Sequence, residues 1–199
     1  MTIDFSKRTH WIFDMDGTLT LAVHDFPAIR NKLGINKDLD IIEAIESLPP
    51  EEAREKFRLL DEIEIELTLR SQKQPGAEQL LALLYEQNKM LGILTRNTVR
   101  NAKDTLVECN LKKFFPDQQI LGRESATPKP SPDGINILLN KWEVDPASAV
   151  MVGDYKYDLE AGRRAGTATI YVDVNEENLW SDFADLHVYH LNQIFDIIK

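Results

Sequence analysis

Two aspartates separated by one residue follow a short apolar run near the start of the sequence. Residues 11–13 are typical of a buried strand, Asp14 and Asp16 come directly after them, and Gly17 allows the backbone to turn sharply. Ligands bind at the carboxyl ends of strands in an open parallel sheet. Two carboxylates in one such place repel each other, so they need a cation, a shared proton or strong hydrogen-bond donors.

Other polar residues follow the later expected strands in the same way. Thr95 comes after the second strand, and Lys129 lies in a proline-rich turn between the third and the fourth. Asp154 comes after the fourth strand, and Asp158 follows four residues later. Because the carboxyl ends of parallel strands lie along one edge of a sheet, we expect these side chains to gather there.

Each of these residue types has a chemical use in phosphoryl transfer. Asp14 can act as a nucleophile that takes up a phosphoryl group, and Asp16 as a general acid and base. A hard cation such as Mg²⁺ would compensate the acidic cluster, with Asp154 as a second ligand. Lys129 offers a fixed positive charge, and Thr95 offers a hydroxyl and nearby N–H groups to a phosphate.

Each residue also has a purely structural interpretation. Thr95 and Asp158 taken alone are typical helix caps, Asp154 a turn residue, and Lys129 a solvated surface lysine. The aspartate pair at the start of the chain could be two solvated acids before a turn. These interpretations require several coincidences in one chain order, so the combined pattern favours a shared site.

The elements that must position these residues alternate between strands and helices after residue 76. This alternation predicts an α/β fold with a parallel sheet covered on both faces. The expected strands are residues 11–13, 90–94, 119–121, 149–152, 169–172 and 186–190, and the expected helices are 77–88, 98–109, 133–142, 158–165, 176–183 and a terminal one from 192.

Residues 22–74 have a different pattern, because their apolar residues recur at helical spacing only. We expect three helices there, near residues 25–35, 38–48 and 51–71. The sequence therefore predicts a core domain made of residues 1–21 and 75–199, with residues 22–74 inserted as an all-helical domain.

Composition restricts the class of partner. The 199 residues are 43% hydrophobic, enough for a core, and carry a net charge of −10. So acidic a surface disfavours nucleic acid and anionic membranes as main partners. A single cysteine, Cys109, excludes an internal disulfide, and no apolar stretch approaches a leader or a membrane span. We expect a cytoplasmic protein that is a monomer or a weak homodimer.

The chemical residues resemble the haloacid dehalogenase superfamily of phosphohydrolases over about residues 10–173. Four motifs match in order: Asp14-Met15-Asp16-Gly17-Thr18, Thr95, Lys129, and Gly153-Asp154-x-x-x-Asp158. The resemblance implies a Rossmann-like core and bound Mg²⁺. It also implies a helical cap after the first motif, similar to that of the phosphoglycolate phosphatase-like subgroup.

The resemblance also implies a role for each matched residue. Asp14 would be the nucleophile, and Asp16 the acid and base that also binds the metal through its backbone carbonyl. Asp154 would be a further metal ligand. The remaining matched residues would support the site or hold the phosphate: Gly17, Thr18, Asp158, Thr95 and Lys129.

Two departures from the family pattern concern the substrate. Many relatives carry an aspartate soon after the first motif, where this chain has Thr20-Leu21-Ala22. The second motif often reads Thr-Asn, whereas here Arg96 separates Thr95 from Asn97. We expect Arg96 and Asn97 to help bind the phosphate, although a surface ion pair is an equal alternative for Arg96.

The preferred function is a Mg²⁺-dependent phosphatase of a small phosphorylated metabolite, either phosphoglycolate-like or a sugar phosphate, acting through a phospho-aspartate on Asp14. One alternative is a phosphomutase, which would not release free phosphate in steady turnover. Another is a phospho-acceptor or binding module, in which phosphorylated Asp14 would be long-lived. A catalytically silent interaction protein is a third.

Five other residues that can do chemistry are assigned lesser roles. Cys109 lies on an apolar helical face and is expected in the core, and His187 and His190 are expected to be structural. His24 and Arg30 belong to the inserted segment and could touch the substrate.

Overall fold

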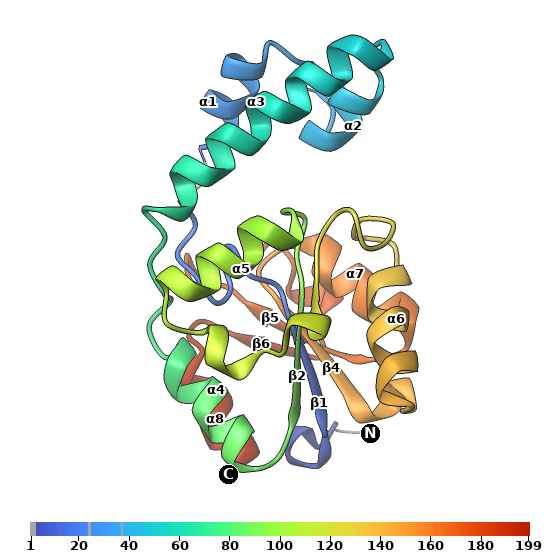
Figure 1. The fold of residues 1–199 in the computed structure, drawn as a ribbon. Coiled ribbons are helices and arrows are strands. Elements are labelled where there is room, and N and C mark those ends of the chain that lie inside the picture. Colours follow the sequence, from blue (N-terminus) through green and yellow to red (C-terminus); the bar gives the residue numbers. More distant parts are fainter. Residues whose placement is uncertain (1–2, 24, 37) are drawn as a thin grey trace. The chain divides into compact units, whose positions relative to one another are not determined.

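The computed structural model describes residues 3–23, 25–36 and 38–199, and its strands form one sheet. Within those residues the sheet has six parallel strands in the order β3-β2-β1-β4-β5-β6 (Figure 1). The strands are β1 (His10–Phe13), β2 (Met90–Leu94), β3 (Ile120–Leu121), β4 (Ala149–Gly153), β5 (Ala168–Val172) and β6 (Leu186–Val188). The predicted α/β fold with a parallel sheet is confirmed.

Strand β1 occupies the middle of the sheet, between β2 and β4, and is buried on both faces. Its side chains alternate between two cores, with Trp11 and Phe13 in one and Ile12 in the other. The ladder to β4 continues one residue past the strand, because the Asp14 N–H donates to the Val152 carbonyl at 2.9 Å. The sheet itself therefore fixes the backbone of the first aspartate.

Helices cover both faces of the sheet, as expected for parallel strands. One face packs against α4 (Ala77–Glu86), α5 (Val99–Glu108) and α8 (Asn192–Ile198), whose buried residues share a core with Trp11 and Phe13. The other face packs against α6 (Asp133–Trp142) and α7 (Lys156–Ala165) (Figure 1). Each of these helices begins within two residues of its predicted start.

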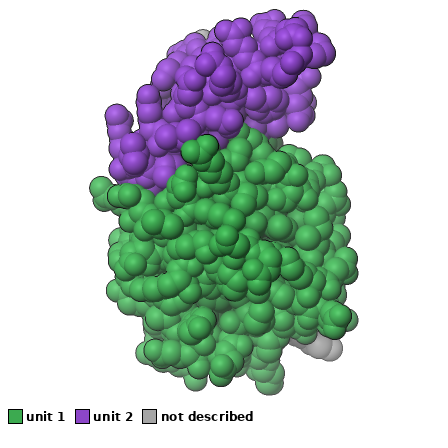
Figure 2. All heavy atoms as spheres, in the orientation of Figure 1, with its two compact units in different colours: residues 1–22, 72–199 green, residues 23–71 purple. Residues whose placement is uncertain are grey.

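The chain divides into two compact units, residues 1–22 with 72–199 and residues 23–71 (Figure 2). The smaller unit consists of α1 (Phe26–Leu33), α2 (Ile41–Glu46) and α3 (Pro50–Thr68). These helices enclose a small core of their own, to which Leu33, Ile45 and Leu60 contribute. Side chains of Asp25 and Asp40 accept N–H groups at the starts of α1 and α2.

Two backbone hydrogen bonds link the segment by which the chain leaves the larger unit to the segment by which it returns. The Leu21 N–H donates to the Gln72 carbonyl, and the Gln74 N–H donates to the Leu19 carbonyl, both at 2.8 Å. These bonds pair the outgoing and returning segments within that unit.

One predicted element is wrong. Residues 176–183 do not form the expected helical piece, because only Ser181–Phe183 makes a single 3-10 turn. Glu176 and Asn178 have φ of 57° and 55°, the left-handed region that a right-handed helix excludes. The cause is Asp173, whose carboxylate accepts the N–H groups of Glu177 and Asn178 and thereby holds the chain in a loop.

Helix α6 offers a matched test of core packing. Leu138→Ala removes a side chain with no exposed surface, so the free energy of unfolding should fall by about 2–5 kcal/mol. Ile137→Ala, one residue earlier and 40% exposed, should change it by less than about 1 kcal/mol. Urea unfolding measures both, and equal losses would contradict the assigned face of α6.

Candidate active site

The turn after β1 brings two acids to the sheet edge. The Met15 carbonyl accepts the N–H groups of Leu19 and Thr20, both at 2.9 Å, and Gly17 has φ of 88°. A Cβ on Gly17 would overlap the Asp154 carboxylate, so glycine is needed for the turn to approach β4 this closely. The positive φ of Gly17 agrees with the sharp turn expected at this glycine.

Lys129 lies between two aspartates from different elements. Its Nζ is 2.5 Å from Asp14 Oδ1 and 2.6 Å from Asp158 Oδ1. Only 4% of Lys129 is exposed, so its interpretation as a solvated surface lysine is wrong. The ion pairs join the end of β1, the loop before α6 and the first turn of α7.

A third carboxylate, that of Asp154, lies near the two that pair with Lys129. Asp14, Asp154 and Asp158 each offer an oxygen, and the three oxygens lie within 4.8 Å of one another. Thr18 donates its hydroxyl to Asp154 Oδ1 at 2.8 Å, which orients that carboxylate. Such an all-oxygen donor set suits a hard cation, and Mg²⁺ is bound in proteins by one or two carboxylates of this kind.

The side chain of Asp16 lies outside this group of three. Its Oδ2 accepts the Asn97 amide at 2.7 Å, and its Oδ1 accepts the Thr20 hydroxyl at 3.4 Å. The two aspartates of the first motif therefore have different partners, since Asp14 pairs with Lys129. The resemblance implies that Asp16 would contact a metal through its backbone carbonyl.

Thr95 and Asn97 come from the carboxyl end of β2. The Asn97 N–H donates to the Thr95 hydroxyl at 3.2 Å, and Thr95 is buried. The residue that caps α5 is Thr98, whose hydroxyl accepts the Asn101 N–H, so Thr95 is not the helix cap. Arg96 is half-buried, with its guanidinium 5.4 Å from the centroid of the Tyr157 ring.

Asp158 has both of the roles considered for it. Its Oδ2 accepts the Tyr155 N–H at 3.1 Å at the start of α7, while its Oδ1 pairs with Lys129. The structural and the functional interpretation are compatible because the two carboxylate oxygens face different partners.

Burial shifts the acid–base properties of the site. It raises the pKa of Asp16 to about 7, and the charge of Asp14 adds to the effect. Burial likewise raises the pKa of Asp158 to about 6, with repulsion from Asp14 opposed by Lys129. Burial would lower the pKa of Lys129, but Asp14 and Asp158 raise it above its usual value. Burial and the neighbouring charge of Asp14 together disfavour the ionised acids, and a bound cation would oppose this effect.

Cys109, His187 and Arg30, which were expected to have lesser roles, lie in three different surroundings. Cys109 is buried, and burial raises its pKa to about 11, as befits a core thiol. His187 Nε2 lies 3.2 Å from Asp173 Oδ2. Arg30 belongs to α1 of the smaller unit, and His24 lies outside the described residues.

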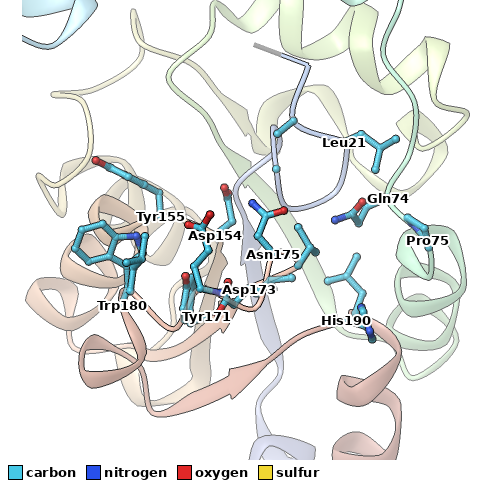
Figure 3. Close-up of a pocket in the computed structure, with 17 residues that line it drawn as sticks. Leu21, Gln74, Pro75, Asp154, Tyr155, Tyr171, Asp173, Asn175, Trp180 and His190 are labelled. Carbon is cyan, nitrogen blue, oxygen red and sulfur yellow. Dashed lines mark hydrogen bonds between the residues drawn. The ribbon is translucent and has the colours of Figure 1, made fainter. Parts of the chain in front are cut away.

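The sequence interpretation missed one part of the site, at the carboxyl end of β5. Asp173 follows that strand directly, as Asp14 follows β1, and this position was the available signal. The loop after it borders a cavity of about 610 Å³ that reaches Asp154 and Gly17 (Figure 3). His190, expected to be structural, also lines this cavity.

Comparisons with known proteins agree with this fold. A family model described as haloacid dehalogenase-like hydrolase matches residues 11–172. An uncharacterized hydrolase of Saccharomyces cerevisiae is 32% identical over 94% of this chain and 89% of its own length. The N-acetylmuramic acid 6-phosphate phosphatase of Pseudomonas putida is 26% identical over 93% of this chain and 95% of its own.

Among solved structures, a haloacid dehalogenase-like family hydrolase from Streptococcus pneumoniae superimposes with a TM-score of 0.79. The two share 19% sequence identity, and the superposition covers 98% of this chain and all 100% of that one. The likeness shows a common fold. A search of the described helices finds none with the length and apolar character of a membrane span.

Lys129 provides a test of the charge balance. Lys129→Met leaves the carboxylates of Asp14 and Asp158 buried without their cation, so the free energy of unfolding in EDTA should fall by about 3–5 kcal/mol. Lys103→Met, which breaks a pair with the exposed Asp117, should cost about 1 kcal/mol or less. Equal losses in the two variants, measured by denaturant unfolding, would contradict the buried ion pairs.

Proposed function

Because this chain belongs to the haloacid dehalogenase-like hydrolase family, we propose that it is a Mg²⁺-dependent phosphatase that hydrolyses a small phosphate monoester through a phospho-aspartate on Asp14. The observation that carries the proposal is that the two aspartates of the first motif have different hydrogen-bond and ion-pair partners. Asp14 pairs with a buried lysine, whereas Asp16 is held by an amide and a hydroxyl. Neighbouring carboxyl groups in unlike surroundings are suited to unlike catalytic roles.

In the first half of the reaction a carboxylate oxygen of Asp14 attacks phosphorus and forms an acyl phosphate. The bond from phosphorus to the alcohol oxygen breaks, and Asp16 donates a proton to that oxygen as it leaves. Lys129 and Thr95 hold the phosphoryl oxygens, and the Asn97 amide orients the Asp16 carboxyl group.

In the second half Asp16, now a carboxylate, takes a proton from water. The resulting hydroxide attacks phosphorus, the bond to Asp14 breaks, and inorganic phosphate leaves. Asp14 and Asp154, with the Asp16 carbonyl, would hold Mg²⁺, which supplies positive charge to the phosphoryl group when bound. Asp158 keeps Lys129 in place from its other side.

The smaller helical unit is proposed to act as a cap. It is a compact insertion directly after the first motif and has its own core. Closure of such a unit over a bound ester would exclude bulk water during the chemical step. The Pseudomonas putida relative, named N-acetylmuramic acid 6-phosphate phosphatase, supports a small phosphate ester as substrate.

Replacement of the nucleophile tests the covalent step. Asp14→Asn should lower kcat by about 10⁴-fold or more, because an amide cannot accept the phosphoryl group. Asp117→Asn, an exposed aspartate that pairs with Lys103 and Lys112, is the matched control and should keep full activity. Circular dichroism should show both variants folded, and retained turnover in Asp14→Asn would exclude a phospho-aspartate on this residue.

Metal removal tests the dependence on Mg²⁺ and separates the alternative functions. Phosphate release from a panel of small phosphate monoesters should occur with Mg²⁺, stop with EDTA and return when Mg²⁺ is restored in excess. Transfer between positions of a sugar phosphate without free phosphate would identify a mutase instead. Stable phosphorylation of the protein without turnover would identify a phospho-acceptor.

A further inference from the structure

A cavity within the larger unit adjoins the acidic cluster. It has a volume of about 610 Å³, within the range of small-molecule sites, and Asp154 and Gly17 form one end of it. Figure 3 shows its other walls, which come from the loop after β5 and from residues near the point where the chain returns to this unit. A group bound there would lie next to a proposed metal ligand.

The loop after β5, which forms one wall of the cavity, is held by hydrogen bonds to Asp173. Asp173 accepts the N–H groups of Glu177 at 3.1 Å and Asn178 at 2.8 Å. These donors and His187 keep the pKa of Asp173 below its usual value, although burial acts in the opposite direction. The loop is thereby preformed, with the side chains of Asn175 and Glu177 bordering the cavity.

The charges around the cavity have one sign. Three of the side chains that border it are acidic, namely Asp154, Asp173 and Glu177. No lysine or arginine is found among its described lining residues, and His190 is the basic side chain there. Asp154 is a proposed Mg²⁺ ligand, so Asp173 and Glu177 are the carboxylates that would repel a second negative charge on the ligand.

The remaining surface suits a group with many hydroxyls. Gln74 and Asn175 present amides, which can donate to a hydroxyl and accept from it. Tyr155 and Trp180 lie on the same side of the cavity, with ring centroids 5.5 Å apart and planes at 73° (Figure 3). Aromatic rings at a cavity wall can pack against the C–H groups of a polyol or sugar, and Tyr155 is 48% exposed.

We infer that this cavity binds the alcohol part of the phosphate ester and selects a neutral polyol or sugar over an alcohol that carries a carboxylate. The inference rests on the proposed phosphatase function and narrows it, because it favours the sugar-phosphate class over the phosphoglycolate-like class. Glu177 contributes most to the discrimination against a carboxylate, because it is exposed, borders the cavity and carries a negative charge.

A matched pair of esters tests the inference. Glycerol 3-phosphate and 3-phosphoglycerate have the same carbon chain and differ in a CH₂OH group against a carboxylate. The kcat/KM of the full chain with Mg²⁺ should be at least about tenfold higher for glycerol 3-phosphate. Calorimetric titration of the Asp14→Asn variant with both esters, again with Mg²⁺, should show the same order of affinity without turnover.

A charge reversal in the cavity provides the second measurement. Glu177→Lys should lower the ratio of the two kcat/KM values by about tenfold or more, mainly by improving 3-phosphoglycerate. Glu86→Lys makes the same charge change on the exposed side of α4 and should leave the ratio unaltered.

The outcomes separate this inference from the proposed function. Equal values for the two esters, a preference for 3-phosphoglycerate, or no measurable binding of glycerol 3-phosphate to Asp14→Asn would overturn the inference. A ratio that Glu177→Lys and Glu86→Lys change alike would overturn it as well. Failure of the wild-type chain to release phosphate from any monoester would instead overturn the proposed function, while the binding order still decides the inference.

Discussion

The buried ion pairs of Lys129 with Asp14 and Asp158 are the interaction on which the rest of the site depends. Charges taken out of water carry a large desolvation cost, which close partners must offset. Here the partners come from the end of β1, from the loop before α6 and from the first turn of α7. The sheet register and the start of α7 must both form correctly before this lysine can be buried.

One lysine does not balance all the acids gathered at this edge of the sheet. Asp14, Asp154 and Asp158 present oxygens to a common space, and Asp16 lies close enough for Asp14 to raise its pKa. The remaining negative charge is what makes the edge suited to a divalent cation and, through it, to a phosphate. An acidic protein can thus attract an anionic substrate locally although its net charge is −10.

The loop after β5 lies beside the acidic cluster and borders the cavity that is proposed to recognise the alcohol part of the ester. The carboxylate of Asp173 accepts the N–H groups of Glu177 and Asn178 in the following loop. That loop borders the cavity beside Asp154. The chemistry and the proposed recognition of the alcohol therefore depend on neighbouring strand ends of one rigid sheet. A change in the loop can alter the choice of alcohol while the acids on β1 and β4 remain in place.

The class of fold and the acidic candidates could be predicted from the sequence alone, because hydrophobic period and residue type are local properties. The apolar runs before Asp14 and Asp154 predicted buried strands, and the strands are there. The burial of Lys129, and the two partners of the Asp158 carboxylate at the start of α7 and on Lys129, depend on tertiary contacts. The partners of Lys129 lie 115 and 29 positions away, so no local pattern reports them. The sequence predicts a helix over residues 176–183, but the Asp173 carboxylate accepts the N–H groups of Glu177 and Asn178, and this competition is visible only in the folded chain.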